Sequence, residues 1–299
     1  MKFLTTEDNF LGIEDPRLYE YGSSKIVIQS FPYEHTSSYL QGSNKGPEEI
    51  LKASHFVEFY DEETDHEAYQ KVGICTLEPY DIAGRVNKEA IDFLYEKTKE
   101  QIANNKFVVT LGAEHSIAVS MVRAYQEKYS NIKCLQIDAH SDLRTAYQDN
   151  PYSHASALAR VFDLGVPLTQ VGIRAQCKEE AMLIKNNPDT IHTWYAHMVH
   201  STPDWIDKVV ETLKGAPVYV TIDADGFDPS VMPAVGTAEP NGLTWHQGTQ
   251  LLKKVAEKCN VVGFDIVEIA PRENEILTQF NCAKLLYKFI SYLSFYNRI

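Results

Sequence analysis

The sequence predicts an α/β fold whose central sheet is mainly parallel. Short runs rich in Val and Ile alternate along the chain with longer segments whose apolar residues recur at helical spacing. This alternation is typical of right-handed βαβ units, in which helices cover both faces of a parallel sheet. The 299 residues are 44% hydrophobic, enough for one large core, and no low-complexity linker divides them. A single domain over residues 1–299 is therefore expected.

The elements follow one another in a regular order. Strands are expected at residues 25–29, 72–77, 107–111, 132–137, 168–173, 190–194, 218–222 and 261–267. Helices are expected at residues 47–59, 87–102, 115–129, 153–163, 179–186, 203–213, 244–258 and 274–296. Pro47 suits the first turn of its helix, Asn87 and Thr244 stand where an N-terminal cap is needed, and Ser153 is expected to start its helix.

Charge and cysteine content narrow the class of protein. The formal net charge of −13 argues against nucleic acid or an anionic membrane as a partner and is compatible with a cationic substrate. The five cysteines include no CxxC pair, and Glu7 and Asp8 precede any apolar stretch. No segment is long and apolar enough to cross a bilayer. We therefore expect a cytoplasmic protein with no nucleic-acid or membrane partner.

Three clusters of Asp and His follow directly after predicted strands. They are Gly112-Ala-Glu-His115, Asp138-Ala-His-Ser-Asp142 and Asp223-Ala-Asp225. Because ligands bind beyond the carboxyl ends of parallel strands, the three clusters are expected to meet at one edge of the sheet. The candidate ligands are His115, Asp138, His140, Asp142, Asp223 and Asp225.

The spacing within the clusters indicates a two-metal hydrolytic centre. An extended backbone would point Asp138, His140 and Asp142 to one side, and Asp223 and Asp225 likewise. Alone, Asp-x-Asp is more often a turn or helix cap, and His115 a capping or packing residue. Together, four carboxylates match the charge of two divalent cations and would repel one another without them. Carboxylate and imidazole ligands favour Mn²⁺ and leave Zn²⁺, Fe²⁺ and Co²⁺ open.

These motifs resemble the signatures of the ureohydrolase family, which includes arginase and agmatinase. The first two are Asp138-Ala-His-Ser-Asp142 and Asp223-Ala-Asp-Gly-Phe-Asp228-Pro, and Gly112-Ala-Glu-His-Ser116 resembles a third, usually Gly-Gly-Asp-His-Ser. The similarity runs in order through nearly the whole chain. It implies the arginase-like three-layer α/β/α sandwich, two Mn²⁺ ions per subunit, hydrolysis of a guanidino group to urea, and homo-oligomers that are trimers or hexamers.

The resemblance also assigns roles. His115, Asp138, Asp142 and Asp225 would surround one or both metal ions, with His140 and Asp223 completing the site. His154 matches the family's catalytic histidine, and Glu268 matches the glutamate that holds the guanidinium. Asp142 would hold a proton of the attacking water and pass it to the leaving amine, and His154 would shuttle protons. Without the resemblance, His154 is a loop histidine and Glu268 a strand-end carboxylate.

Agmatine is the expected substrate, with putrescine and urea as products. Residues 143–153 lack the Ser-Gly-Asn stretch with which arginases hold an amino-acid group. Residues 150–154 and 236–243 are instead similar to agmatinase. Arg144 could attract a carboxylate if it faced the pocket, which keeps guanidinobutyrate, arginine and formiminoglutamate open. Residues 33–43 form either part of the pocket rim or an ordinary surface loop.

The motifs depart from the family pattern at three positions. Glu114 replaces an aspartate, Ala113 a glycine, and Ala155 a residue that is glycine in many members. None removes a ligand, so activity is expected, and the longer Glu114 is expected to affect a contact behind the metal ligands and hence metal affinity. Two other classes stay open: a different two-metal hydrolase, such as a phosphoesterase, and a catalytically silent relative.

Overall fold

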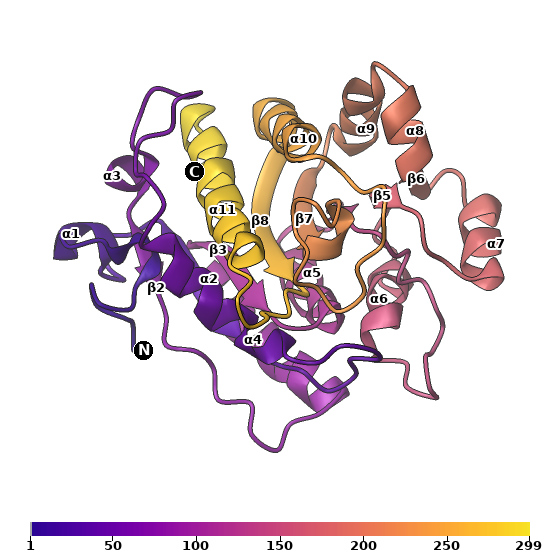
Figure 1. Cartoon of the computed structure of the whole chain (residues 1–299), viewed down its shortest axis with the longest axis horizontal. Helices are drawn as coiled ribbons and strands as arrows, with labels where there is room; N and C mark the ends of the chain where they lie inside the picture. Colours follow the sequence, from indigo (N-terminus) through magenta and orange to yellow (C-terminus); the bar gives the residue numbers. More distant parts are fainter. Residues whose placement is uncertain (1) are drawn as a thin grey trace.

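A sheet of eight parallel strands forms the centre of the computed structural model, which describes residues 2–299 (Figure 1). The strand order is β2-β1-β3-β8-β7-β4-β5-β6. The strands are β1 Ile26–Phe31, β2 Ile74–Thr76, β3 Phe107–Gly112, β4 Lys133–Ile137, β5 Leu168–Ile173, β6 Ile191–Tyr195, β7 Pro217–Asp223 and β8 Asn260–Val267. Every pair of neighbouring strands is parallel, which confirms the predicted sheet.

Helices cover both faces of the sheet. The α-helices are α1 Pro16–Tyr19, α2 Gly46–Ser54, α3 Ala68–Val72, α4 Lys88–Ala103, α5 Ala118–Lys128, α6 Ala157–Asp163, α7 Lys178–Asn186, α8 Ala196–Ser201, α9 Trp205–Leu213, α10 Trp245–Lys258 and α11 Leu277–Phe295. Short 3-10 helices are η1 Phe10–Gly12, η2 Ser43–Lys45, η3 His115–Ile117, η4 His154–Ser156 and η5 Ala224–Gly226. Three of these, η3, η4 and η5, carry or adjoin predicted site residues.

Alternate residues of the strands enter two separate cores. Val109 packs with apolar residues of α2, α9, α10 and α11. Its neighbour Val108 packs with residues of α4, α5 and α6. Because successive side chains of a strand point to opposite faces, the sheet must lie between two helical layers. The three-layer arrangement is therefore confirmed (Figure 1).

Several predicted boundaries are wrong by a few residues. The helix after Pro47 ends at Ser54, and the last helix begins at Leu277. Val72 belongs to α3, and a turn at Gly73, with φ of +62°, separates it from β2. Apolar residues at the end of a helix and at the start of a strand cannot be told apart when they are contiguous in sequence.

Two predicted helix caps had different outcomes. The Oγ1 of Thr244 accepts a hydrogen bond from the backbone N–H of Gln247, as predicted for the start of α10. Asn87 precedes α4, but its side chain makes no capping bond. Its Oδ1 instead accepts a hydrogen bond of 2.7 Å from Nδ2 of Asn150, so the predicted cap is wrong.

Within residues 2–299, no helix combines the length and apolarity that crossing a membrane requires. The sheet order brings β3, β8, β7 and β4 together at its centre. Each of these four strands leads into one of the predicted site segments, so the carboxyl edge of the sheet centre is the place to look for function.

Candidate metal centre

Four adjacent strands deliver the site residues to one edge of the sheet. His115 follows β3, Asp138 follows β4, Asp223 ends β7, and Glu268 follows β8. The η5 turn can lie against β4 because it contains Gly226, where a Cβ would stand 2.7 Å from the backbone N of Asp138. This close approach lets the Asp225 carboxylate accept a hydrogen bond of 3.1 Å from the backbone N–H of Ala139.

One group of potential ligands surrounds the ring of His115. Its Nδ1 lies 3.0 Å from Asp138 Oδ2, 3.2 Å from Asp142 Oδ2 and 3.4 Å from Asp223 Oδ2. All four side chains are buried. The ligand atoms of His115, Asp138 and Asp142 lie close enough together to hold one metal ion.

A second group surrounds the ring of His140. Its Nδ1 lies 3.0 Å from Asp225 Oδ2 and 3.7 Å from Asp138 Oδ1. The ligand atoms of Asp138, His140 and Asp225 also lie close enough to hold one ion. Asp138 is common to both groups, with Oδ2 nearer His115 and Oδ1 nearer His140, so its carboxylate could contribute to both ion sites.

Burial and mutual repulsion disfavour the ionised forms of two of the buried carboxylates, Asp138 and Asp223. Burial, with the charges of Asp142 and Asp225, raises the pKa of Asp138 to about 7. Burial and the charge of Asp225 also raise the pKa of Asp223 well above its usual range. Asp225 is the exception: although burial opposes it, the charge and hydrogen bond of His140 hold its pKa low. Cations would remove this repulsion.

The hydrogen bonds around His115 indicate which of its ring nitrogens could bind a metal ion. Thr221 Oγ1 donates to Asp265 Oδ1 over 2.7 Å, so its one proton is already used. His115 Nε2, 2.9 Å from the same oxygen, must then donate to it. In the neutral ring this leaves Nδ1 with a lone pair directed at carboxylate oxygens. Nδ1 is buried and has no hydrogen bond in the neutral ring, and, although burial opposes it, the neighbouring carboxylates raise the pKa of His115 well above its usual value. Its lone pair therefore favours a positive partner, either a proton or a metal ion.

The alternating residues of the Asp and His clusters predict an extended backbone, but the structure brings their side chains together in another way. The strand β4 ends at Ile137, and Asp142 has a left-handed φ of +54°. Asp225 lies in the η5 turn, and its backbone N–H donates to Asp223 Oδ1 over 2.9 Å. The expectation that an extended backbone aligns these side chains is therefore wrong. Turns beyond the strand ends converge them instead.

Glu268 lies beside these groups on a strained backbone. Its φ is +66°, and its backbone N–H donates to the carbonyl of Ala113 over 2.8 Å. Its Oε1 accepts a hydrogen bond of 2.7 Å from the backbone N–H of His115. Burial, followed by the nearby charge of Glu114, raises the pKa of Glu268 well above its usual range. A cationic group beside it would favour the ionised form.

His154 faces the centre from the start of η4. Its Nδ1 lies 3.1 Å from Thr36 Oγ1, and its Nε2 lies 3.4 Å from Ser38 Oγ. Its ring also meets the ring of Tyr147 edge-on, with centroids 5.9 Å apart. The loop that contains Thr36 and Ser38 therefore holds this histidine, and the prediction that residues 33–43 contribute to the pocket rim is confirmed.

The groups open into two connected hollows. An inner chamber of about 30 Å³ is lined by residues 37–40 of the loop and by six predicted site residues: His140, Asp142, His154, Asp223, Asp225 and Glu268. An outer hollow of about 270 Å³ shares Ser38, His140, Asp142 and His154 with it. Arg144 and Glu239 line this outer part. All predicted site residues except the deeper His115 and Asp138 thus line the chamber, and those two lie in contact with residues that do.

Arg144 is held at the wall of the outer hollow. Its Nε lies 3.9 Å from Glu180 Oε2, and its guanidinium lies 5.4 Å from the ring centroid of Tyr147. Glu180 in turn accepts backbone hydrogen bonds from Leu143 and Cys177. The carboxylate of Glu239 is less constrained, with His140 Nε2 at 3.9 Å.

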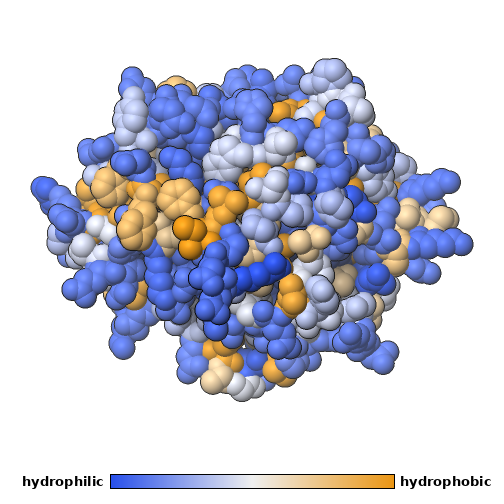
Figure 2. Space-filling model, viewed as in Figure 1, coloured by the Kyte–Doolittle hydropathy of each residue, from blue (hydrophilic) through white to orange (hydrophobic). Residues whose placement is uncertain are grey.

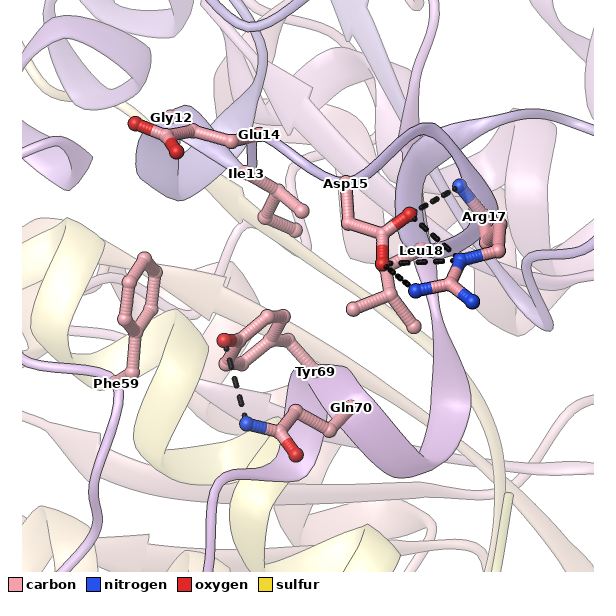
Figure 3. A pocket seen from close by; sticks show the side chains of 9 residues that line it. All are labelled: Gly12, Ile13, Glu14, Asp15, Arg17, Leu18, Phe59, Tyr69 and Gln70. Carbon is pink, nitrogen blue, oxygen red and sulfur yellow. Dashed lines mark hydrogen bonds and ion pairs between the residues drawn. The ribbon is translucent and has the colours of Figure 1, made fainter.

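A roomier hollow of about 700 Å³ lies elsewhere, among the N-terminal segment, α1 and α3 (Figure 3). Two of its charged residues, Asp15 and Arg17, bind each other through several hydrogen bonds. It contains no group of potential metal ligands, and the two such groups found in residues 2–299 are both at the strand ends. Volume alone therefore does not identify the functional site.

Three supporting residues were not foreseen from the sequence. Thr221 and Asp265 lie inside otherwise apolar strands and support His115. Their polar side chains in such strands could have indicated a role in the site. Thr36 gave no signal, because it lies in a polar loop. The hydrogen bonds of Glu114 go to this loop and to Ser116. Its expected effect on metal affinity stays a prediction.

The comparisons with known proteins agree with this geometry. The model of the arginase family matches residues 24–291. N(1)-aminopropylagmatine ureohydrolase of Synechocystis sp. is 36% identical over 296 residues, 97% of this chain and 95% of that protein. Agmatinase of Bacillus cereus is 33% identical over 258 residues, 84% of this chain and 85% of that protein. The crystal structure of agmatine ureohydrolase of Thermoplasma volcanium matches with a TM-score of 0.81 and 31% identity, over 94% and 93% of the two chains. Together with the four-strand site, these matches confirm the resemblance in the motifs: the chain belongs to the arginase family.

Proposed function

We propose that this protein is a binuclear manganese hydrolase that cleaves a guanidino group to urea and an amine. The observation that supports this most strongly is the pair of His and carboxylate groups that share Asp138. His115, Asp138, Asp142 and Asp223 would hold one Mn²⁺, and Asp138, His140 and Asp225 the other. When bound, the two ions would lower the pKa of a water between them.

Glu268 would bind the guanidinium of the substrate. Its Oε1 is fixed by the backbone N–H of His115, and its side chain lines the inner chamber. A carboxylate and a planar guanidinium form paired, charge-assisted hydrogen bonds, which orient the guanidinium carbon as well as bind it. The narrow chamber would keep other water away from the reacting carbon.

Asp142 and His154 would transfer protons during the reaction. Asp142 belongs to the ligand group around His115 and also lines the chamber, so its carboxylate could take a proton from the attacking water and give it to the leaving amine. His154 lines both the chamber and the outer hollow, where it can exchange protons between the leaving amine and solvent. The reaction consumes one water and yields urea and the free amine.

Agmatine is the first candidate substrate, which would give putrescine and place the enzyme in polyamine biosynthesis. It is supported by the agmatinase relatives and by Glu239, whose carboxylate at the outer hollow suits a distal ammonium. N(1)-aminopropylagmatine is the second candidate, favoured by the relative that is 36% identical and by the room of about 270 Å³ beyond the chamber. Arg144 at the same wall would suit a carboxylate, so arginine, guanidinobutyrate and formiminoglutamate belong in the test.

The assembly and location are also proposals. We infer a single-domain subunit in a cytoplasmic homo-oligomer, a trimer or hexamer, with no nucleic-acid or membrane partner. Large apolar side chains are exposed in several places, among them Phe56, Ile276 and Phe280. Figure 2 shows one face that is mostly hydrophilic and carries a patch of apolar residues. Light scattering of the purified protein would give the subunit number.

A urea assay tests the proposal directly. The protein, stripped of metal and reloaded with Mn²⁺, is given agmatine, N(1)-aminopropylagmatine, arginine, guanidinobutyrate and formiminoglutamate in parallel. We expect urea from agmatine or its aminopropyl derivative, and much less from the substrates that carry a carboxylate. No urea from any of them would contradict the proposed function. Release of phosphate from a general phosphoester instead would favour the other two-metal class.

A further inference from the structure

Glu114 is fully buried beside the metal centre and reaches into the loop that forms the pocket wall. Its Oε1 accepts hydrogen bonds from three consecutive backbone N–H groups: His35 at 2.5 Å, Thr36, and Ser37 at 2.9 Å. Its Oε2 accepts from Thr36 Oγ1 at 2.8 Å and from Ser116 Oγ at 3.3 Å. All of its hydrogen-bond partners are donors, so both oxygens of the Glu114 side chain act as acceptors.

The hydroxyl of Thr36 connects this carboxylate to His154. Thr36 has one hydroxyl proton, and the contact with Glu114 uses it. The same oxygen must therefore act as an acceptor toward the backbone N–H of His154 at 3.0 Å and toward its Nδ1 at 3.1 Å. In the neutral ring, the proton then resides on Nδ1, and Nε2 is left free to accept a proton.

The free Nε2 is the atom that the proposed chemistry needs. Its contact is Ser38 Oγ, at 3.4 Å, and both His154 and Ser38 line the inner chamber and the outer hollow. A proton taken up at Nε2 would leave a charged ring, which the Glu114 carboxylate stabilises through the Thr36 hydroxyl. The same logic operates at His115, where Asp265 and Thr221 fix the opposite tautomer.

We propose that Glu114 is a positioning residue that acts through Thr36 to set the Nδ1–H tautomer of His154. The effect on catalysis rests on the proposed function, whereas the tautomer does not. An aspartate at this position would withdraw the carboxylate by about 1.5 Å, one carbon–carbon bond, and beyond hydrogen-bonding distance of the present loop. The glutamate in this chain is therefore matched to the course of its residues 35–38.

Glu114→Gln reverses the direction of the hydrogen bonds that run from residue 114 through the Thr36 hydroxyl to His154, here called the relay. The amide NH₂ of glutamine can donate to Thr36 Oγ1, which releases the hydroxyl proton to donate to His154 Nδ1 and moves the ring proton to Nε2. Thr36→Val removes the relay without changing Glu114. Glu96→Gln makes the same substitution at an exposed position on α4 and serves as the control.

Nitrogen NMR of ¹⁵N-histidine-labelled protein reads the tautomer. The holoprotein is loaded with Zn²⁺, which is diamagnetic, and the His154 signals are assigned by comparison with His154→Asn. We expect the Nδ1–H form in the wild type and in Glu96→Gln, the Nε2–H form in Glu114→Gln, and a mixture in Thr36→Val. An Nε2–H form in the wild type, or no change in either Glu114→Gln or Thr36→Val, would overturn the proposal.

A double-mutant cycle then tests the link to turnover on the Mn²⁺-loaded enzyme. Glu114→Gln should lower kcat about tenfold, within the contribution expected of a general acid or base, with KM changed less than about twofold. In the His154→Asn background the same change should cost less than about twofold more, because the effect passes through His154. A full tenfold loss in that background, or a loss of bound Mn²⁺, would contradict the proposal. If no variant, wild type included, releases urea, the proposed function fails, and the NMR result still decides the tautomer.

Discussion

Thr221→Val tests whether the support behind His115 matters for metal binding. The hydroxyl accepts from His115 Nε2 at 2.9 Å and donates to Asp265 at 2.7 Å, and all three side chains are buried. Valine has nearly the same shape, so packing is preserved while both hydrogen bonds are lost. The substitution leaves the ring free to rotate or to change tautomer, and it leaves the Asp265 oxygen without this donor.

The magnitude follows from what such supporting contacts are worth. Loss of a hydrogen bond behind a metal-binding histidine typically lowers metal affinity by about 10- to 100-fold. Leaving buried polar groups unpaired also costs about 1–3 kcal/mol of folding stability for each group. We therefore expect Thr221→Val to bind Mn²⁺ at least tenfold more weakly and to be less stable without metal.

The assay is competition between the protein and a chelator for Mn²⁺, with Thr221→Ser as the matched control. Serine retains the hydroxyl, so its Mn²⁺ affinity should stay within about threefold of the wild type. Thermal unfolding of the metal-free proteins measures the cost to stability. Equal Mn²⁺ affinity in wild type and Thr221→Val would refute the role given to this hydroxyl.

Three further predictions follow from the site. Glu268→Gln should lower kcat/KM for the guanidino substrate about 100-fold, because paired charge-assisted hydrogen bonds are worth about 3 kcal/mol. The amount of bound Mn²⁺ should not change. An unchanged kcat/KM would exclude the role of Glu268 in binding the guanidinium. Glu239→Gln should raise KM for agmatine and N(1)-aminopropylagmatine about tenfold and leave KM for arginine unchanged or lower. Equal effects on KM for all three substrates would argue against a substrate cation beside Glu239. Asp138 has a raised pKa of about 7, so the folded metal-free chain holds this proton more tightly than the unfolded chain does. The contribution of Asp138 to the stability of metal-free protein should therefore be present below about pH 4 and be lost as the pH rises through 7. Denaturant titrations of the wild type and Asp138→Asn measure this contribution as the difference in stability between them, and Mn²⁺ should cancel the loss. A difference that grows in favour of the wild type over this range without metal would contradict the proximity of the carboxylates.

The strand pattern and the strand-end clusters were enough to predict the sheet, its layers and the location of the site. They succeeded because buried parallel strands are nearly continuous apolar runs, and because His115, Asp138 and Asp223 stand directly after such runs. The ends of helices were harder to predict. Asn87 has the residue type of a cap, yet a contact with Asn150 uses its side chain, and that pairing depends on the tertiary fold.

The details of the site could not be predicted from local patterns. The left-handed backbone at Asp142 and Glu268 is uncommon outside glycine and is fixed by contacts between distant segments. The relays through Thr36 and Thr221 join residues far apart in the chain. The direction of a hydroxyl proton depends on both of its partners, so the three-dimensional arrangement is needed to assign it.

The number of Mn²⁺ ions bound per chain tests the central claim most directly. Equilibrium dialysis followed by elemental analysis should give two ions per wild-type chain. Asp138→Asn replaces the carboxylate shared by both groups with a neutral amide and should retain fewer than two Mn²⁺ ions. The exposed control Glu96→Gln should retain both ions. A wild type that binds no Mn²⁺ or only one ion, or an Asp138→Asn variant that binds two ions as tightly as the wild type, would contradict the account.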